Sequence, residues 1–370
     1  MTKTYLHRVD AIRGIAILLV LTYHTLLFLY PGYEAKKYSD NGVLVISDIK
    51  TAMLNFNPIG QGWIGVELFL VISGFLIHFI YLQTPNEFKW NAFFGKRFWR
   101  IYPPYLLALS FFFINSINLN KSGLIDFFSH VFLIHNLSDK TFFSINPSFW
   151  SIALEAQLYC IYPIYIIFIK YLGSTKTTII LLLTTIAFCF FALVCNIHSL
   201  SFYSFVINFW FIWAAGAFLA DRYHHNKKLF NNPLIWFSVF YIFFFLFKLF
   251  YLSNSFVLIP ATLSCLALME VILYTDIIDK FRISKIAYKF LSHIGLISYS
   301  IYLIHQPYLS DLLNFFNPNT GLPHLNNFIS VAFTYLTLFL VSYSINKLVE
   351  LKSIEYGRRI RMKIITSANI

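Results

Sequence analysis

The sequence predicts an all-α polytopic membrane protein of about ten transmembrane helices with both termini in the cytoplasm. Of its 370 residues, 58% are hydrophobic and only 12% are charged, whereas a soluble domain is nearer half apolar and a quarter charged. The apolar residues also fall into runs of about 20, the length that a helix needs to cross the hydrocarbon core of a bilayer. We therefore expect the bilayer itself to be a partner of the chain.

Ten such runs follow one another along the chain. The first has no small-residue cleavage site after it, so we expect a retained helix and not a removable signal peptide. A shorter apolar piece at 124–137 is too short to span and is interpreted as interfacial or re-entrant. The predicted spans are 11–30, 61–82, 99–117, 149–171, 177–197, 203–222, 233–251, 255–277, 292–313 and 326–349.

The distribution of lysine and arginine orients these spans. With the N-terminus inside, most of the 28 basic residues fall in inner segments, which is the pattern of the positive-inside rule. The net charge of +12 is explained by this topology together with attraction to anionic lipid, so no nucleic-acid partner is expected. The basic residues left outside are Lys36, Lys37, Lys50, Lys121, Lys140 and Lys248.

Several kinds of chemistry have no signal in this sequence. The four cysteines lie inside predicted spans without metal-ligand spacing, and we interpret them as small core residues. His224 and His225 are adjacent, not one helical turn apart as a helical metal site requires. No Walker motif, dinucleotide fingerprint or zincin helix occurs. We expect no metal site and no tightly bound cofactor.

The first span carries three ionisable residues on one stripe. Asp10 lies one turn before Arg13, and the eleven steps from Arg13 to His24 turn only about 20° beyond three full circles. They also separate the two residues by roughly 16 Å along the axis. Ionisable groups in lipid are costly and usually face a bundle interior or a water-filled cavity. We therefore hypothesise that these three residues belong to a functional site.

Later spans add further ionisable residues at depth. Glu67 and Glu155 each lie about six residues from the outer end of a span, and His305 lies deep in the span 292–313. Glu67 either reaches back to the outer interface or lines a cavity, and a lone histidine in an apolar helix is usually a hydrogen-bonded core residue. Glu270 is interpreted as a structural group with a partner and not as a reacting one.

A compact basic group lies at the cytoplasmic end of the span 99–117 and consists of Lys96, Arg97 and Arg100. One interpretation is ordinary anchoring at the cytoplasmic face. The other is phosphate recognition, because guanidinium pairs bind phosphate oxygens bidentately. The sequence alone leaves both open.

The depths sort these residues into two layers. Measured from the span ends, His24, His305, Glu67 and Glu155 fall at about the same level in the outer half of a roughly 30 Å core. A carboxylate beside an imidazole is an arrangement for general-base catalysis. The inner layer, suited to a polyphosphorylated cytosolic ligand, holds Asp10, Arg13, Lys96, Arg97 and Arg100.

With these residues in hand, the chain resembles the acyltransferase-3 family, bacterial integral-membrane O-acyltransferases that modify surface glycans. The resemblance runs from about residue 8 to about residue 355. Six stretches carry it in order: RVDAIRGIAILLVLTYH, GWIGVELFLVISGFLI, KRFWRIYPPY, FWSIALEAQLY, ISYSIYLIHQP and a terminal LVE.

The resemblance implies roles for particular residues. His24 would act as proton acceptor, while Arg13, Arg97 and Arg100 would be needed for activity through acyl-CoA. Glu155 matches the carboxylate of the family's SxxxE stretch.

The resemblance also covers His305 and Glu67, one of which departs from the family's usual residue. His305 matches the histidine of the family's Y-x-x-H pattern. Glu67 stands where the family more often has Asp, so the role of this side chain is less certain. No second esterase-like domain is expected, because the chain ends about 20 residues after the last span.

We therefore expect a membrane-embedded acyltransferase domain at 1–355 and a basic cytoplasmic tail at 356–370, in the bacterial inner membrane. Acetyl-CoA, as co-substrate, would dock its phosphates on the inner layer, and His24, oriented by Glu155 or Glu67, would deprotonate a hydroxyl of the acceptor. That acceptor would be a surface or lipid-linked glycan such as lipopolysaccharide O-antigen, capsule or exopolysaccharide. Direct transfer and an acyl-enzyme both fit.

The rival hypothesis is a transporter or flippase whose histidines and carboxylates relay protons. Transporters often show inverted repeats and paired broken helices, and no convincing repeat relates the two halves of this sequence. A scaffold without chemistry would leave the buried ionisable residues unexplained.

Overall fold

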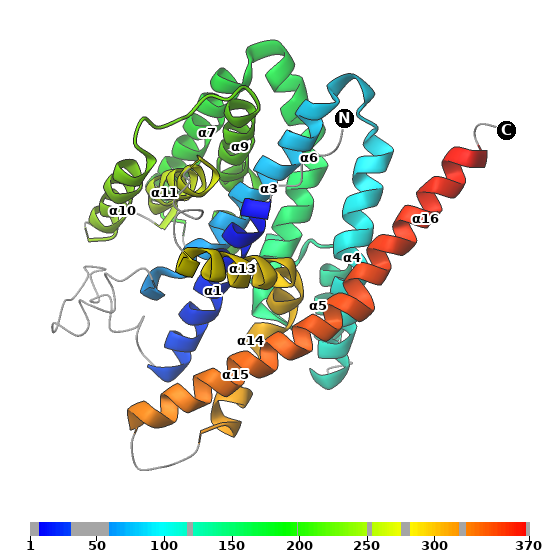
Figure 1. Cartoon of the computed structure of the whole chain (residues 1–370), viewed down its shortest axis with the longest axis vertical. Helices are drawn as coiled ribbons and strands as arrows, with labels where there is room; N and C mark the ends of the chain where they lie inside the picture. The colour runs from blue at the N-terminus through cyan, green and yellow to red at the C-terminus, as the bar shows by residue number, and fades with distance from the viewer. Residues whose placement is uncertain are drawn as a thin grey trace. The chain divides into compact units, whose positions relative to one another are not determined.

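The computed structural model describes residues 7–30, 59–116, 121–197, 199–249, 254–274, 282–317 and 323–367. Within these ranges the secondary structure is helical and contains no strand, which confirms the all-α prediction (Figure 1). The outer loop that carries Lys36, Lys37 and Lys50 lies outside the described residues. The chain divides into two compact units, 1–83 with 160–298 and 84–159 with 299–370, which we describe in turn.

Within the described residues, 7 helices are long and apolar enough to cross a membrane, so the chain is a polytopic membrane protein. Helices also cover the other three predicted spans. One of these differs from the prediction, because the segment expected as a single span at 292–313 is two helices that meet at Ile297. The total of ten spans and their orientation remain predictions.

The first unit is built around its N-terminal helix α1. Its helices are α1 (His7–Leu29), α3 (Ile64–Gln83), α7 (Ser174–Val194), α9 (Val206–His224), α10 (Pro233–Leu249), α11 (Asn254–Tyr274) and α13 (Arg282–Leu296), with the latter part of α6 (Trp150–Leu172). Helix α1 packs against α3 and α13, and α3 packs against α9. The charged stripe of α1 is therefore held among neighbouring helices.

Glycines set how closely these helices approach. A Cβ on Gly295 of α13 would overlap the backbone carbonyl of Asp10, and one on Gly14 would overlap the carbonyl of Leu291. Gly74 of α3 likewise lies against the backbone of Trp213 in α9. Small residues at helix contacts of this kind are typical of bundles embedded in lipid.

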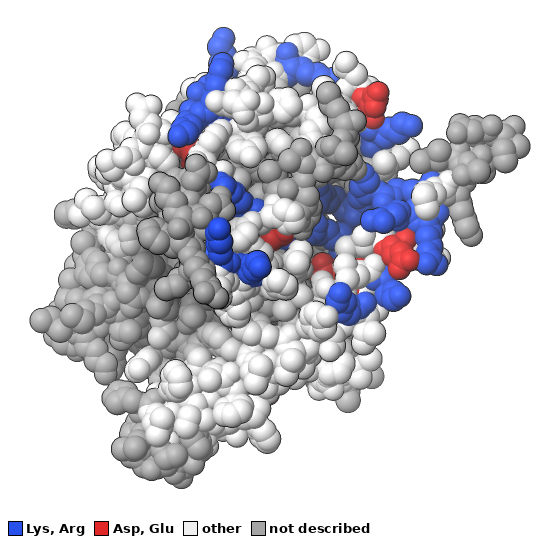
Figure 2. Space-filling model, viewed as in Figure 1, with Lys and Arg blue, Asp and Glu red and all other residues white. Residues whose placement is uncertain are grey.

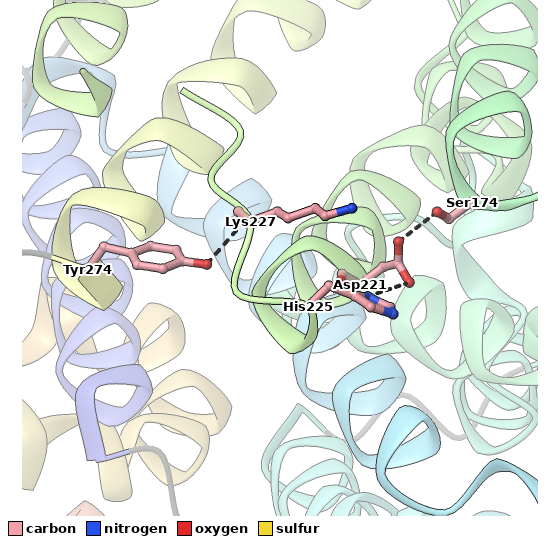
Figure 3. Close-up of polar contacts among 5 residues, drawn as sticks. All are labelled: Ser174, Asp221, His225, Lys227 and Tyr274. Carbon is pink, nitrogen blue, oxygen red and sulfur yellow. Dashed lines mark hydrogen bonds and ion pairs between the residues drawn. The ribbon is translucent and has the colours of Figure 1, made fainter. Parts of the chain in front are cut away.

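Polar contacts fix the loop that follows α9. The Ser174 hydroxyl donates a 2.8 Å hydrogen bond to the Asp221 carboxylate, and the Tyr274 hydroxyl donates to the carbonyl oxygen of Lys227 at 3.2 Å (Figure 3). The Glu270 carboxylate accepts hydrogen bonds from the backbone N–H groups of Leu229 and Phe230, at 2.6 and 2.9 Å. The structural interpretation of Glu270 is thus confirmed.

The second unit contains α4 (Trp90–Ser116), α5 (Lys121–Val131), the start of α6, α14 (Ser298–Phe315), α15 (Pro323–Ile345) and α16 (Leu351–Ser367). A π-helical turn, Asn346–Glu350, joins α15 to α16. The buried Glu350 in that turn accepts hydrogen bonds from Ser300 and Asn346. The interfacial piece expected at 124–137 is the short helix α5 and a 3₁₀ turn at His135–Leu137.

The cysteines only partly match the expectation of core residues. Cys189 and Cys265 are buried, but Cys160 and Cys195 are exposed. A predicted span has a face toward neighbouring helices and a face toward lipid, and a small apolar residue is tolerated on either. All four are free thiols.

Candidate active site

The head of α1 brings Asp10 and Arg13 together. A guanidinium nitrogen of Arg13 lies 3.8 Å from a carboxylate oxygen of Asp10, and each side chain is 12% exposed. This i, i+3 pairing is the one that their spacing predicts. Because both groups are largely removed from solvent, their attraction is screened less than that of an exposed pair.

The imidazole of His24 is oriented by its own helix. Its Nδ1 lies 3.0 Å from the carbonyl oxygen of Val20, one turn earlier. A carbonyl oxygen can only accept a hydrogen bond, so we assign the proton of the neutral ring to Nδ1. This tautomer makes Nε2 the basic nitrogen. The histidine thus has the protonation pattern that a general base requires.

Glu67 is buried in the first turn of α3, with only 2% of its surface exposed. Its burial excludes the interpretation in which it reaches back to the outer interface. The segment that carries it lies against α1, because a Cβ on Gly62 or Gly65 would overlap the backbone of Leu19 or Ala16. Glu67 and His24 therefore stand on two helices of the same unit that are in direct contact.

In the second unit, Arg97 lies over two aromatic rings. Its guanidinium carbon is 5.4 Å from the ring centroid of Tyr159 on α6 and 5.8 Å from that of Phe93 on α4. The hydroxyl of the same Tyr159 donates a hydrogen bond to the Glu155 carboxylate. Tyr159 thus joins a residue of the predicted basic layer to a residue of the predicted carboxylate layer.

The other two basic residues of α4 lie near Arg97 on the helix surface. Lys96 is exposed and Arg100 is intermediate in exposure. Arg100 follows Arg97 by three residues, so both project from one side of α4. The rest of the described structure thus does not enclose either side chain.

His305 is buried in α14, and its Nδ1 lies 2.9 Å from the carbonyl oxygen of Tyr302. The Tyr302 hydroxyl in turn lies 2.6 Å from the hydroxyl of Ser151 on α6. Pro307 follows two residues later and has no N–H with which to bond the carbonyl of Leu303. The side-chain amide of Asn146 donates to that carbonyl instead, at 3.0 Å.

The sequence interpretation missed Asn146. Its side-chain oxygen Oδ1 accepts hydrogen bonds from the backbone N–H and the hydroxyl of Ser148, at 3.0 and 2.8 Å, at the start of the turn that leads into α6. The local signal was present, because Asn followed by Pro is a typical helix start. Its second contact, to Leu303, joins residues too distant in sequence for any local pattern to reveal.

A pair of buried histidines was also missed. The rings of His130 and His135 stack with centroids 3.7 Å apart and an angle of 4° between their planes. Desolvation, aided by the charge of His130, lowers the pKa of His135 to about 3. Desolvation also lowers the pKa of His130. Both rings are therefore neutral at physiological pH.

The structure places the predicted site residues in both units. His24, Glu67, Asp10 and Arg13 lie in the first unit, and the remaining residues lie in the second. Within the units it joins Asp10 to Arg13 and links Arg97 to Glu155 through Tyr159. The single outer layer and the single inner layer draw on both units and remain predictions.

Taken together, these features define a polytopic helical membrane protein with oriented histidines and carboxylates in its spans and a basic group on α4. The chain matches the acyltransferase-3 family, described as an acyltransferase domain, over residues 6–347. It therefore belongs to that family. No solved structure matches the chain.

Three similar proteins illustrate the range of relatives. The chain is 26% identical over 193 residues to the peptidoglycan O-acetyltransferase OatA of Listeria monocytogenes, covering 47% of this chain and 26% of that protein. It is 26% identical over 208 residues to the putative peptidoglycan O-acetyltransferase YrhL of Bacillus subtilis, covering 50% and 28%. It is 26% identical over 319 residues to the putative acetyltransferase ORF330 of Acidianus two-tailed virus, covering 82% and 84%. The match spans about a quarter of the length of the first two relatives.

Proposed function

We propose that this protein is an O-acyltransferase of the bacterial inner membrane that transfers an acetyl group from cytosolic acetyl-CoA to a hydroxyl of a surface or lipid-linked glycan. The observation that carries the proposal is the assigned tautomer of His24 within an acyltransferase-3 chain. A base fixed in this way is what acyl transfer to a hydroxyl requires. The fold alone would not assign this activity, because one fold hosts many functions.

The donor is an acyl-CoA. The basic residues of α4 support it, because guanidinium groups match phosphate oxygens and coenzyme A carries several phosphates. The guanidinium carbon of Arg97 lies 5.8 Å from the ring centroid of Phe93 and 5.4 Å from that of Tyr159, and cation–π contacts of this kind stabilise the position of an arginine. The N–H donors of a guanidinium lie in its plane and are the groups that bond phosphate oxygens.

The reaction is an acyl transfer from sulfur to oxygen. His24 Nε2 takes the proton of the acceptor hydroxyl as its oxygen attacks the thioester carbonyl carbon. The carbon–oxygen bond forms, the carbon–sulfur bond breaks, and the thiolate of coenzyme A receives the proton from the imidazolium. A buried carboxylate such as Glu67 stabilises the imidazolium while it exists.

The acceptor is a glycan that faces the outer side of the membrane. The names of two relatives, which act or are thought to act on peptidoglycan, support a polymeric sugar as acceptor. Peptidoglycan therefore joins lipopolysaccharide, capsule and exopolysaccharide among the candidates.

Mass spectrometry of surface polysaccharide and peptidoglycan tests the proposal. The samples come from cells that carry the intact protein and from cells that lack it. We expect sugars that gain the mass of one acetyl group in place of a hydroxyl hydrogen only when the protein is present. Identical spectra from both, together with no thioester cleavage by the purified protein, would contradict it.

A further inference from the structure

The C-terminal helix α16 lies along the basic end of α4. Gly357 of α16 lies against the side chain of Trp99, where a Cβ would overlap the indole ring. The Ser353 hydroxyl donates a hydrogen bond to the carbonyl oxygen of Trp99. The ring of Tyr356 meets the same indole edge-on, with centroids 5.0 Å apart. These contacts fix which face of α16 meets α4.

Arg361 extends this contact toward the start of α4. Its Nη1 donates to the carbonyl oxygen of Ala92 at 3.4 Å, and its Nε donates to the carbonyl of Gly357 at 3.2 Å. Gly95 of α4 lies beneath the Arg361 side chain, and a Cβ built on this glycine would lie 4.0 Å from Cδ of Arg361. Two of the five N–H donors of the guanidinium are used in these bonds. The group is thus held over α4 with donors remaining for a ligand.

Helical positions on α4 place the contact point of Arg361 beside the basic group Lys96, Arg97 and Arg100. Taking Ala92 as the origin and 100° per residue, Lys96 lies at about 40°, Arg100 at about 80° and Arg97 at about 140°. The four cations therefore follow one another around the surface of α4. Figure 2 shows lysine and arginine side chains gathered over α4 and α16.

The acidic side chain nearest in sequence does not neutralise Arg361. Glu355 pairs with Arg359 at 2.7 Å, in an exposed i, i+4 ion pair. Arg359 projects about 160° away from Arg361 around α16. It provides a cation of the same type on the same helix, turned away from α4.

We propose that Arg361 of the C-terminal helix is a further phosphate-binding residue of the coenzyme A site, completing the basic group Lys96, Arg97 and Arg100. This inference rests on the proposed function, because it deepens the donor half of that site. The other source of the same phosphate chemistry is an anionic lipid headgroup, and the test separates the two.

The test measures acetyl-CoA binding by the full-length protein in nanodiscs of phosphatidylcholine alone. We expect R361Q to raise the Kd about tenfold, the effect of losing a charge-assisted hydrogen bond to phosphate. R361K keeps the charge but loses the fork of donors, so we expect a smaller rise, about threefold. The matched control R359Q, which removes an arginine from the opposite face, stays within about twofold of wild type.

The outcomes are distinct. If R361Q and R361K both bind acetyl-CoA as tightly as the wild type does, the inference is overturned while the proposed function stands. If the wild type binds no acetyl-CoA, the acyl-CoA donor and the inference both fail. A second measurement uses nanodiscs that contain phosphatidylglycerol. If R361Q loses the thermal stabilisation that this lipid gives the wild type, while its Kd for acetyl-CoA is unchanged, the arginine binds lipid and the inference is overturned.

Discussion

The side-chain amide of Asn146 donates a 3.0 Å hydrogen bond to the carbonyl oxygen of Leu303. Pro307 cannot donate the helical hydrogen bond that would otherwise satisfy this oxygen. A buried carbonyl without a donor is costly, and in lipid no water can replace the partner. One polar side chain before α6 therefore stabilises the proline-containing helix that carries His305.

The first prediction concerns this replacement. We expect N146A to destabilise the protein by about 1–3 kcal/mol, because the Leu303 carbonyl loses its donor. Apparent unfolding temperature in detergent is the measurement. Pro307→Ala restores a backbone N–H at the position that can bond Leu303, so N146A should cost less in that background. Equal losses in both backgrounds would show that the amide has no such role.

The second prediction separates two functions of Tyr159. Y159F keeps the ring beneath Arg97 but removes the hydrogen bond to Glu155. We therefore expect it to leave the Kd for acetyl-CoA within about twofold and to lower the rate of transfer. Y159L removes both contacts and should weaken donor binding as well. If Y159F and Y159L behave alike in both assays, Arg97 and Glu155 do not depend separately on this residue.

The third prediction concerns the approach of α13 to α1. A methyl group on Gly295 would overlap the carbonyl oxygen of Asp10, so G295A should lower the unfolding temperature or prevent folding. The control is G95A in α4, where the nearest atom to a Cβ is 4.0 Å away. There the substitution should be neutral or stabilising by about 0.5–1 kcal/mol. Similar effects of the two changes would argue against the close packing of α1 and α13.

The fourth prediction is a pH dependence set by His135. Its folded-state pKa of about 3 lies below the ordinary value of 6.5. Between these two values the histidine is protonated in the unfolded chain but neutral in the folded protein. The free energy of unfolding therefore falls as the pH drops from about 6.5 toward 3. H135F keeps a ring stacked on His130 and should make this fall shallower in thermal unfolding at several pH values. The exposed H293Q serves as control, and an unchanged acid profile in H135F would contradict the assignment.

Long, strongly patterned features were predictable from the sequence. Helix α1 and the placing of Asp10 and Arg13 on one side of it follow from apolar run length and from spacing along one helix. The piece at 124–137 was predictable only as too short to span, and it overlaps the short helix α5. The structural role of Glu270 also followed, because a single carboxylate in an otherwise apolar span needs a partner.

Features that depend on distant partners were not predictable. No proline marks the break between α13 and α14 at Ile297. The break lies just after Gly295, which packs against the backbone of Asp10. The stacking of His130 on His135 and the donation from Asn146 to Leu303 depend on tertiary packing. The roles of Tyr159 and Arg361 also appear only when neighbouring helices are in place.

The central claim is that His24 is the base of an acyl transfer to a glycan hydroxyl. Its most direct test is the mass of the glycan from cells that carry H24N instead of the wild-type protein. The asparagine amide can still donate to the Val20 carbonyl but cannot take a proton, so transfer should fall at least about a hundredfold. The purified variant should still fold and bind acetyl-CoA. Glycan acetylated by H24N at the wild-type level would contradict the claim.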